Sequence, residues 1–132
     1  RKGVAPHFRF YLADVGETEA WGQPVEKLSK QSLDYQLAPL QSEQQSFDVY
    51  MVDGRWRVAS VLASFLHASS RGPNKTPKVL LHDCKSRPRY QKLHELLDLV
   101  DKSERLCVFE RKSSTTDADL LELWKEEYEE SN

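Results

Sequence analysis

Three side chains that could form a catalytic or metal site follow two apolar runs. Asp53 follows the run VYMV, and His82 and Asp83 follow the run VLL. Carboxylates are the hard oxygen ligands that Mg²⁺ prefers, and histidine is the usual general base near neutral pH. We therefore predict catalytic roles for His82 and Asp53 and a metal site at Asp53 and Asp83. Alternatively, Asp53 caps the turn at Gly54, Asp83 pairs with an arginine, and His82 is a buried histidine bonded to the backbone.

Three arginines lie close to these positions in the sequence. Arg55 follows the first aspartate, and Arg87 and Arg89 flank a proline that suits the first turn of a helix. A guanidinium group binds anions in a forked geometry, and a helix N-terminus attracts them. We predict an anion-binding role for Arg55, Arg87 and Arg89. The alternatives are an internal salt bridge for Arg55 and a solvated basic loop for the other two.

Two aromatic residues near the end of the chain, Trp124 and Tyr128, fall on one face of a predicted helix. The acidic sequence EEYEESN at its end opposes the helix dipole, so the end should fray unless a partner covers it. We predict that Trp124 and Tyr128 face a protein partner. Alternatively, they are ordinary core aromatics.

The aspartates must be positioned by the elements that precede them. Residues 47–53 and 78–82 form apolar runs typical of buried strands, and residues 55–69 carry a helical apolar stripe between them. This order predicts a right-handed βαβ unit with parallel strands. Both aspartates would then lie at the carboxyl ends of the strands, where open α/β sheets bind ligands.

The remaining elements are predicted from hydrophobic periodicity and from the positions of proline and helix-capping residues. We expect strands at 8–14 and 106–110, a short helix within 25–37 that Pro39 ends, and a helix from Ser86 to about Val100. A capping box at Thr116 and Asp119 begins the last helix. The predicted organisation is a tail at 1–7, an α/β domain at 8–112, and a linker with an amphipathic acidic helix at 113–132.

The net charge and the length of the apolar runs exclude two classes of function. A chain of 132 residues with net charge −2 has no basic field for nucleic acid, and no apolar run is long enough to cross a bilayer. We therefore expect a soluble, single-domain protein. Cys84 and Cys107 lack metal-site spacing, which predicts free thiols and a reducing compartment such as the cytoplasm or an organelle matrix or stroma.

Four motifs occur in order: DVGETEAWGQP at 14–24, VDGRWRV at 52–58, LLHD at 80–83 and RPRY at 87–90. Together they resemble the later half of class I S-adenosylmethionine-dependent methyltransferases, in particular an uncharacterised methyltransferase-like family. The resemblance covers roughly residues 8–112. It implies a partial Rossmann-like fold, which is a mostly parallel α/β sheet with flanking helices.

The same resemblance implies that the cofactor-binding strands are missing. Such enzymes hold the donor with a glycine-rich loop after the first strand and an acid after the second, and no GxG occurs in this chain. In the parent fold the first strand pairs with the strand that corresponds to VYMV. We therefore expect an unpaired edge there, which either residues 8–14 or another chain would cover.

Two functions follow from these expectations. The first is a non-catalytic methyltransferase-like domain that binds no cofactor and serves as an accessory or structural subunit of a larger complex, such as an organellar photosynthetic or respiratory assembly. The alternative is part of an S-adenosylmethionine-dependent O-methyltransferase whose cofactor-binding half lies upstream or in another chain. Only the alternative involves S-adenosylmethionine or Mg²⁺, with Asp53, His82 and Asp83 lining the acceptor site.

Overall fold

The computed structural model describes residues 8–25, 29–72 and 76–131 of the chain. The tail predicted at 1–7 lies outside these residues. The elements, in order, are η1 (Ala20–Gly22), α1 (Ser29–Gln36), α2 (Ala38–Gln41), β1 (Val49–Val52), α3 (Arg57–Arg71), β2 (Lys78–His82), η2 (Pro88–Glu95), β3 (Leu97–Ser103), β4 (Leu106–Arg111) and α4 (Asp117–Glu127).

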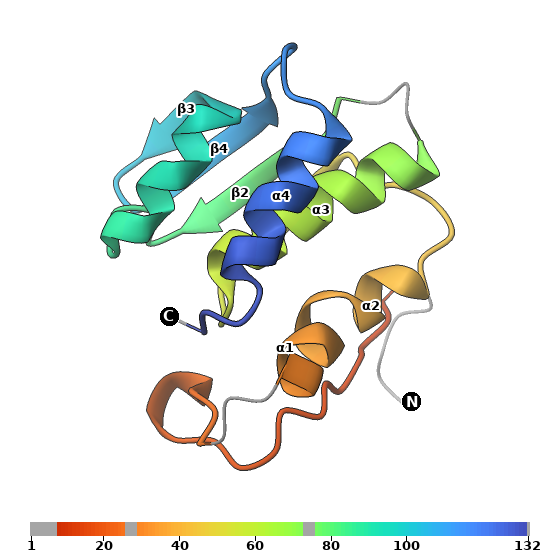
Figure 1. Cartoon of the computed structure of the whole chain (residues 1–132), viewed down its shortest axis with the longest axis vertical. Coiled ribbons are helices and arrows are strands. Elements are labelled where there is room, and N and C mark those ends of the chain that lie inside the picture. Colours follow the sequence, from red (N-terminus) through yellow and green to blue (C-terminus); the bar gives the residue numbers. More distant parts are fainter. Residues whose placement is uncertain (1–7, 26–28, 73–75, 132) are drawn as a thin grey trace.

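The four strands form one sheet in the order β1-β2-β4-β3 (Figure 1). The predicted β1–α3–β2 unit is confirmed, because β1 and β2 pair in parallel with Val49 opposite Lys78 and Val52 opposite Leu81. The prediction of a mostly parallel sheet was wrong. β4 runs antiparallel to both β2 and β3, since β3 and β4 form a hairpin that reaches the sheet without a crossover helix.

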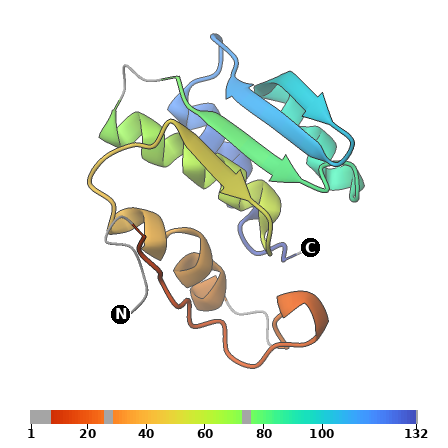
Figure 2. The same cartoon turned by 180° about the vertical axis from the view of Figure 1, so that it is seen from behind.

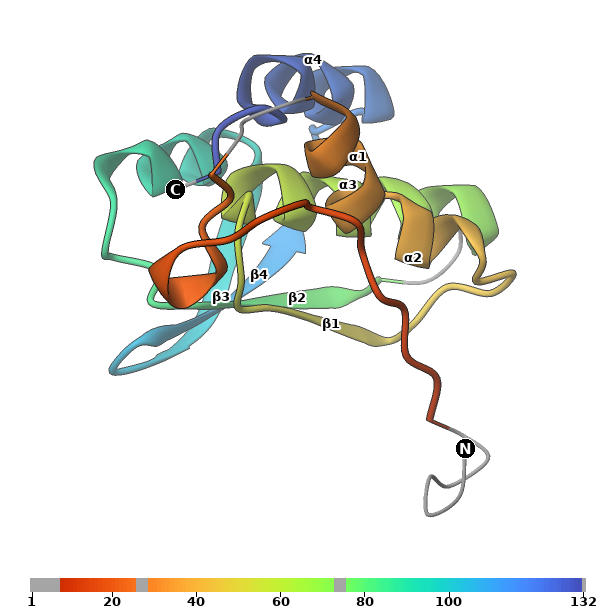
Figure 3. The ribbon, with the colours of Figure 1, turned by 90° about the horizontal axis from the view of Figure 1, so that it is seen from below.

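Helix α3 lies against the sheet because its apolar side chains recur at helical spacing. Val58, Val61, Leu62 and Phe65 are buried as predicted, and small residues such as Ala59 and Ala63 are also buried. Small side chains are needed because α3 packs on the sheet with one side and on α4 with another. Figure 3 shows the result, a sheet below α3 and η2 with α4 above them.

The helices cover one face of the sheet in the described part of the chain (Figure 3). Burial therefore alternates along the strands. Tyr50 and Val52 are buried beneath the helices, whereas Val49 and Met51 on the other face are 55% and 60% exposed. The expectation that residues 47–53 form a buried strand was therefore wrong for one face of β1 in the part of the chain that the structure describes. No helix among the described residues is long and apolar enough to cross a membrane.

The helix predicted from Ser86 to Val100 was also wrong in its second half. The 3₁₀ helix η2 ends at Glu95, and the following residues form β3. Leu93 and Leu97 are buried, but Val100 is 43% exposed near a β-bulge. Pairing with β4, which the local apolar spacing does not encode, decides the conformation of this segment.

Residues 8–14 form no strand. This segment is anchored to α1, where the Tyr11 hydroxyl donates to Asp34 Oδ1 at 2.8 Å, and to the residues after α2, where Arg9 Nε donates to Glu43 Oε1 at 2.9 Å. Helix formation within 25–37 is confirmed by α1, although residues 26–28 lie outside the described residues. Pro39 stands in the first turn of the short helix α2, so it begins that helix instead of ending the previous one.

Helix α4 begins as predicted, with the Thr116 hydroxyl accepting from the Asp119 amide and the Asp119 carboxylate accepting from the Thr116 amide. Its acidic end has basic partners in η2. Lys92 Nζ lies 2.6 Å from Glu127 Oε1, and Arg89 Nη1 lies 3.1 Å from Glu130 Oε2. Two of the acidic side chains at this end, Glu127 and Glu130, are therefore paired within the chain.

Candidate functional site: the rim after β1 and β2

The parallel pairing of β1 and β2 brings the two predicted aspartates to one edge of the sheet. Asp53 directly follows β1, and His82 ends β2 with Asp83 after it. The Nδ1 atom of His82 lies 3.3 Å from Asp53 Oδ1 and 3.6 Å from Asp83 Oδ2. The predicted meeting of these three residues is thus confirmed in space.

The imidazole of His82 faces the carboxylates without an aligned hydrogen bond. Its Nδ1 atom is buried and has no hydrogen-bond partner within the described residues, although the Asp53 carboxylate is close. Asp83 adopts a left-handed backbone with φ of 52°, which aspartate tolerates better than most residues. A small rotation of the imidazole would let one carboxylate orient it, the arrangement that a general base requires.

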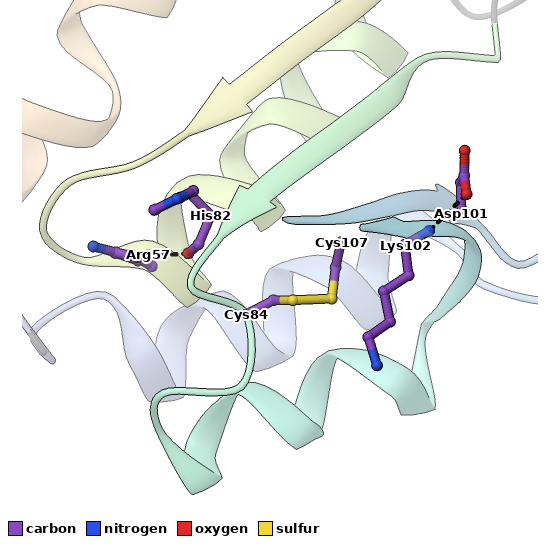
Figure 4. Close-up of a disulfide and its surroundings, with 6 residues drawn as sticks. All are labelled: Arg57, His82, Cys84, Asp101, Lys102 and Cys107. Carbon is purple, nitrogen blue, oxygen red and sulfur yellow. Dashed lines mark hydrogen bonds between the residues drawn. A yellow bond between two sulfur atoms is a disulfide. The ribbon is translucent and has the colours of Figure 1, made fainter. Parts of the chain in front are cut away.

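Arg57 is the central structural residue of this rim. Its Nη1 donates to the His82 carbonyl at 2.5 Å (Figure 4). Its Nε donates to the Gly54 carbonyl at 2.8 Å, and its Nη2 lies 3.4 Å from Asp53 Oδ1. The side chain is only 10% exposed. The guanidinium fork therefore links the turns after both strands. The i, i+4 spacing from Asp53 was the sequence signal for this pair.

The predicted metal site at Asp53 and Asp83 stays a prediction. Within residues 8–25, 29–72 and 76–131, no three His, Cys, Asp or Glu side chains are placed to hold a metal ion together. Both carboxylates already have cationic neighbours: Arg57 lies beside Asp53, and Arg105 Nε lies 3.9 Å from Asp83 Oδ1. Mg²⁺ would have to compete with these pairs and with His82.

The three arginines predicted to bind an anion each have a different partner. Arg55 Nη1 donates to Gln23 Oε1 at 3.1 Å, and its buried Nε has no hydrogen-bond partner among the described residues. Arg89 pairs with Glu130, and Arg87 is exposed with a long contact of 3.4 Å to the Ser86 carbonyl. The anion near Arg89 is a carboxylate of the chain itself, and an anion-binding role for the three arginines stays a prediction.

Tyr35 is a rim residue that the sequence patterns did not reveal. The Tyr35 hydroxyl fills the space that a Cβ atom would take at Gly54, and it accepts a hydrogen bond from the Arg55 amide at 3.2 Å. Its ring packs against Trp56 with centroids 5.1 Å apart. Glycine is therefore required at position 54 because α1 closes directly over this turn.

The aromatic pair predicted to face a partner is partly engaged within the chain. The rings of Trp124 and Tyr128 stack with centroids 4.9 Å apart, and Trp124 Nε1 donates to Gln36 Oε1 at 2.8 Å. Both residues are half-buried. They hold α1 against α4, and a partner-facing role for them stays a prediction.

The prediction of free thiols was wrong, because Cys84 and Cys107 form a disulfide (Figure 4). Leu81 of β2 pairs with Cys107 of β4, and the turn after β2 brings Cys84 to within 5.9 Å of Cys107, measured between Cα atoms. Their spacing of 23 residues carries no signal for this contact. Only the antiparallel register, which the sequence patterns did not predict, brings them together.

Near the disulfide, two lysines lie side by side. Lys102 is opposite Cys107 in the β3–β4 ladder. Its contact with Lys85, through hydrogen bonding first and charge repulsion second, lowers the pKa of Lys102. This end of the sheet is therefore locally basic, in contrast to the carboxylates of the adjacent rim.

Comparison with known proteins supports the fold. No known family model matches the chain, and no curated protein matches it. Among solved structures, a methyltransferase-like protein from Silicibacter pomeroyi DSS-3 is similar, with a TM-score of 0.73 and 25% sequence identity over 91% of this chain. The match covers 60% of that protein. The chain therefore has a methyltransferase-like fold and spans about three fifths of the length of this structural neighbour.

Proposed function

We propose that this methyltransferase-like domain acts as a non-catalytic binding or accessory subunit of a larger protein assembly. The observation that carries the proposal is the uncovered side of the sheet. β1 is an edge strand, and its outward side chains Val49 and Met51 are more than half exposed. Apolar surface of this kind on a sheet edge is typical of a protein interface. An organellar location for the assembly stays a prediction.

The residues at the rim do not fit S-adenosylmethionine. A nucleotide-type donor needs a glycine turn after a strand that lets the ligand approach the backbone. The turn after β1 contains one glycine, Gly54, and the Tyr35 hydroxyl already occupies the space above it. The chain has no GxG sequence. We therefore propose that the chain by itself binds no methyl donor, and we derive no methyl-transfer step.

A second candidate is the acceptor-side part of an S-adenosylmethionine-dependent O-methyltransferase. It is favoured by the arrangement of His82 between Asp53 and Asp83 and by the similarity to a methyltransferase-like protein that is longer than the match. In this case His82 would take the proton of an acceptor hydroxyl, and Asp53 would orient the imidazole. The donor would be bound by residues other than those described.

Calorimetric titration of the full chain with S-adenosylhomocysteine tests the proposal that the chain by itself binds no methyl donor. We expect no binding at millimolar ligand. Micromolar affinity would overturn the non-catalytic proposal, and its loss in Asp53→Asn but not in the exposed control Asp101→Asn would assign the ligand to the rim. A parallel melt with and without Mg²⁺ tests the metal: we expect no shift, and a rise in Tm that Asp53→Asn and Asp83→Asn both remove would establish the site.

A further inference from the structure

Strand β1 presents backbone groups at the edge of the sheet that pair with no other strand among the described residues. The Lys78 amide donates to the Asp48 carbonyl at 3.0 Å, so the backbone groups of residues 48, 50 and 52 face β2. By the alternation of a strand, the amide and carbonyl groups of Val49 and Met51 point outward. β1 contains no lysine or proline, the residues that usually protect an edge. The edge is therefore competent to pair with another strand.

The helical layer extends beyond this edge. Figures 2 and 3 show α1 and α2 beyond β1, on the side of the sheet that the helices cover. They are held there by the bond from Trp124 to Gln36 and by the packing of Tyr35 on Trp56. The helices thus cover the position that one further strand would take, although no strand of the described residues lies there.

A groove of about 630 Å³ runs along β1 in this position. Its walls come from β1, from α1 and α2, and from the anchored segment at residues 8–14. Apolar and aromatic side chains make up most of the lining, with polar side chains from Gln36, Ser60 and Ser64 among them. The charged lining residues Asp53 and Arg55 follow the end of β1. Leu12, in the segment that forms the outer wall, is 94% exposed. The residues that define the groove best are Tyr11, Tyr35, Leu40, Val49 and Met51.

We propose that this groove accepts an apolar β-strand from a partner polypeptide, which extends the sheet by pairing with Val49 and Met51. The inference rests on the proposed binding function and names the form of the partner. β1 spans about 13 Å, so four residues of the partner suffice for the pairing. Side chains of the added strand would lie beside Val49 and Met51 on the open face of the sheet and face Leu40 on the helical side. These neighbours are apolar, so the strand that fits is apolar.

A second copy of the chain fits this groove poorly. Symmetric pairing of two β1 edges would bring the α1 and α2 helices of both copies over the same edge. These helices already extend past β1 in a single chain (Figure 2). The occupant is therefore a strand that carries no such helices beside it.

The test uses the full chain and a defined probe, the peptide acetyl-Lys-Val-Ile-Val-Ile-Val-Lys-amide. Amide hydrogen exchange should be fast at Val49 and Met51 and slow at Tyr50 and Val52 in the free chain. Addition of the peptide should slow exchange at Val49 and Met51. Met51→Pro, which removes an outward amide and leaves the ladder to β2 intact, should weaken peptide binding by about tenfold or more.

Two controls keep the test decisive. Met51→Ala retains the amide and should weaken binding far less than Met51→Pro does. If Met51→Pro does not fold, the same comparison is made with a peptide that is N-methylated at alternate residues and cannot pair on one edge. The methylated peptide should fail to protect Val49 and Met51.

Three results would overturn the proposal. The first is slow exchange at Val49 and Met51 in the free monomer, because the chain would then cover its own edge. The second is a dimer in sedimentation equilibrium with the same amides protected, which would make a second copy the occupant. The third is unchanged exchange with millimolar peptide. Binding of S-adenosylhomocysteine with otherwise expected results would reject the non-catalytic function and leave the groove assignment standing.

Discussion

Breaking the Cys84–Cys107 disulfide gives the largest stability change that can be worked out from the structure. The bond closes a loop between residues 23 apart in the sequence, and loop-closure entropy gives it a stabilising effect of about 3.4 kcal/mol. A domain of this size has a total stability of about 5–15 kcal/mol. The reduced chain should therefore fold but with a much smaller margin.

Urea unfolding followed by circular dichroism measures this effect. The free energy of unfolding of a small domain falls by about 2 kcal/mol per molar urea, so reduction should lower the urea midpoint by about 1.7 M. The double variant Cys84→Ala/Cys107→Ala should unfold near the midpoint of the reduced chain. Reductant should not move the midpoint of this variant, since it has no disulfide to lose.

Thiol counting in denaturant provides the decisive check. We expect no reactive thiol in the chain purified without reductant and two after reduction. Two free thiols in a fully folded chain purified under oxidising conditions would contradict the pairing of Cys84 and Cys107. A midpoint that reductant leaves unchanged would refute the magnitude derived from loop closure.

Three further predictions concern the rim and the last helix. Arg57→Met should lower the free energy of unfolding by about 2–4 kcal/mol. The substitution removes the guanidinium that donates to the Gly54 and His82 carbonyls and lies beside Asp53. Gly54→Ala should lower the Tm, since the Tyr35 hydroxyl occupies the Cβ position, and Tyr35→Phe should partly restore it. Thr116→Ala should cost about 1 kcal/mol by removing the helix cap. Hydrogen bonds from the Thr116 amide and hydroxyl lower the pKa of Asp119. The stability that this cap contributes should therefore be present above about pH 4 and be lost as the pH falls below that value.

Matched variants serve as controls for these substitutions. Arg105→Met replaces a largely exposed arginine of the same rim and should change stability by less than about 0.5 kcal/mol. Ser113→Ala, at an exposed position before the last helix, is the control for the cap. A cost for Arg105→Met equal to that for Arg57→Met would show that the rim does not depend on a buried guanidinium. A pH profile for Asp119→Asn equal to that of the unmodified chain would reject the contribution of the Asp119 carboxylate to the cap.

Local patterns in the sequence were sufficient for the β1–α3–β2 unit and for the rim. Val58, Val61, Leu62 and Phe65 repeat at helical spacing between two apolar runs, and the geometry of a parallel pair places both run ends on one edge. The capping box of α4 was equally local, since all its hydrogen bonds lie within four residues. Helix α3 and the cap depend on contacts between neighbours in the sequence, which periodicity records directly. The pairing of β1 with β2 is long-range, but it follows from the right-handed crossover that joins two parallel strands through a helix.

Long-range contacts decided the rest. Leu97 to Ser103 form a strand and not the end of a helix because β4 supplies the hydrogen bonds, and the same register joins Cys84 to Cys107. Tyr35 reaches Gly54 across 19 residues, and Lys92 reaches Glu127 across 35. A residue's type and spacing do not specify which distant backbone it will meet, so these contacts, and the groove beside β1, were determined only by the tertiary structure.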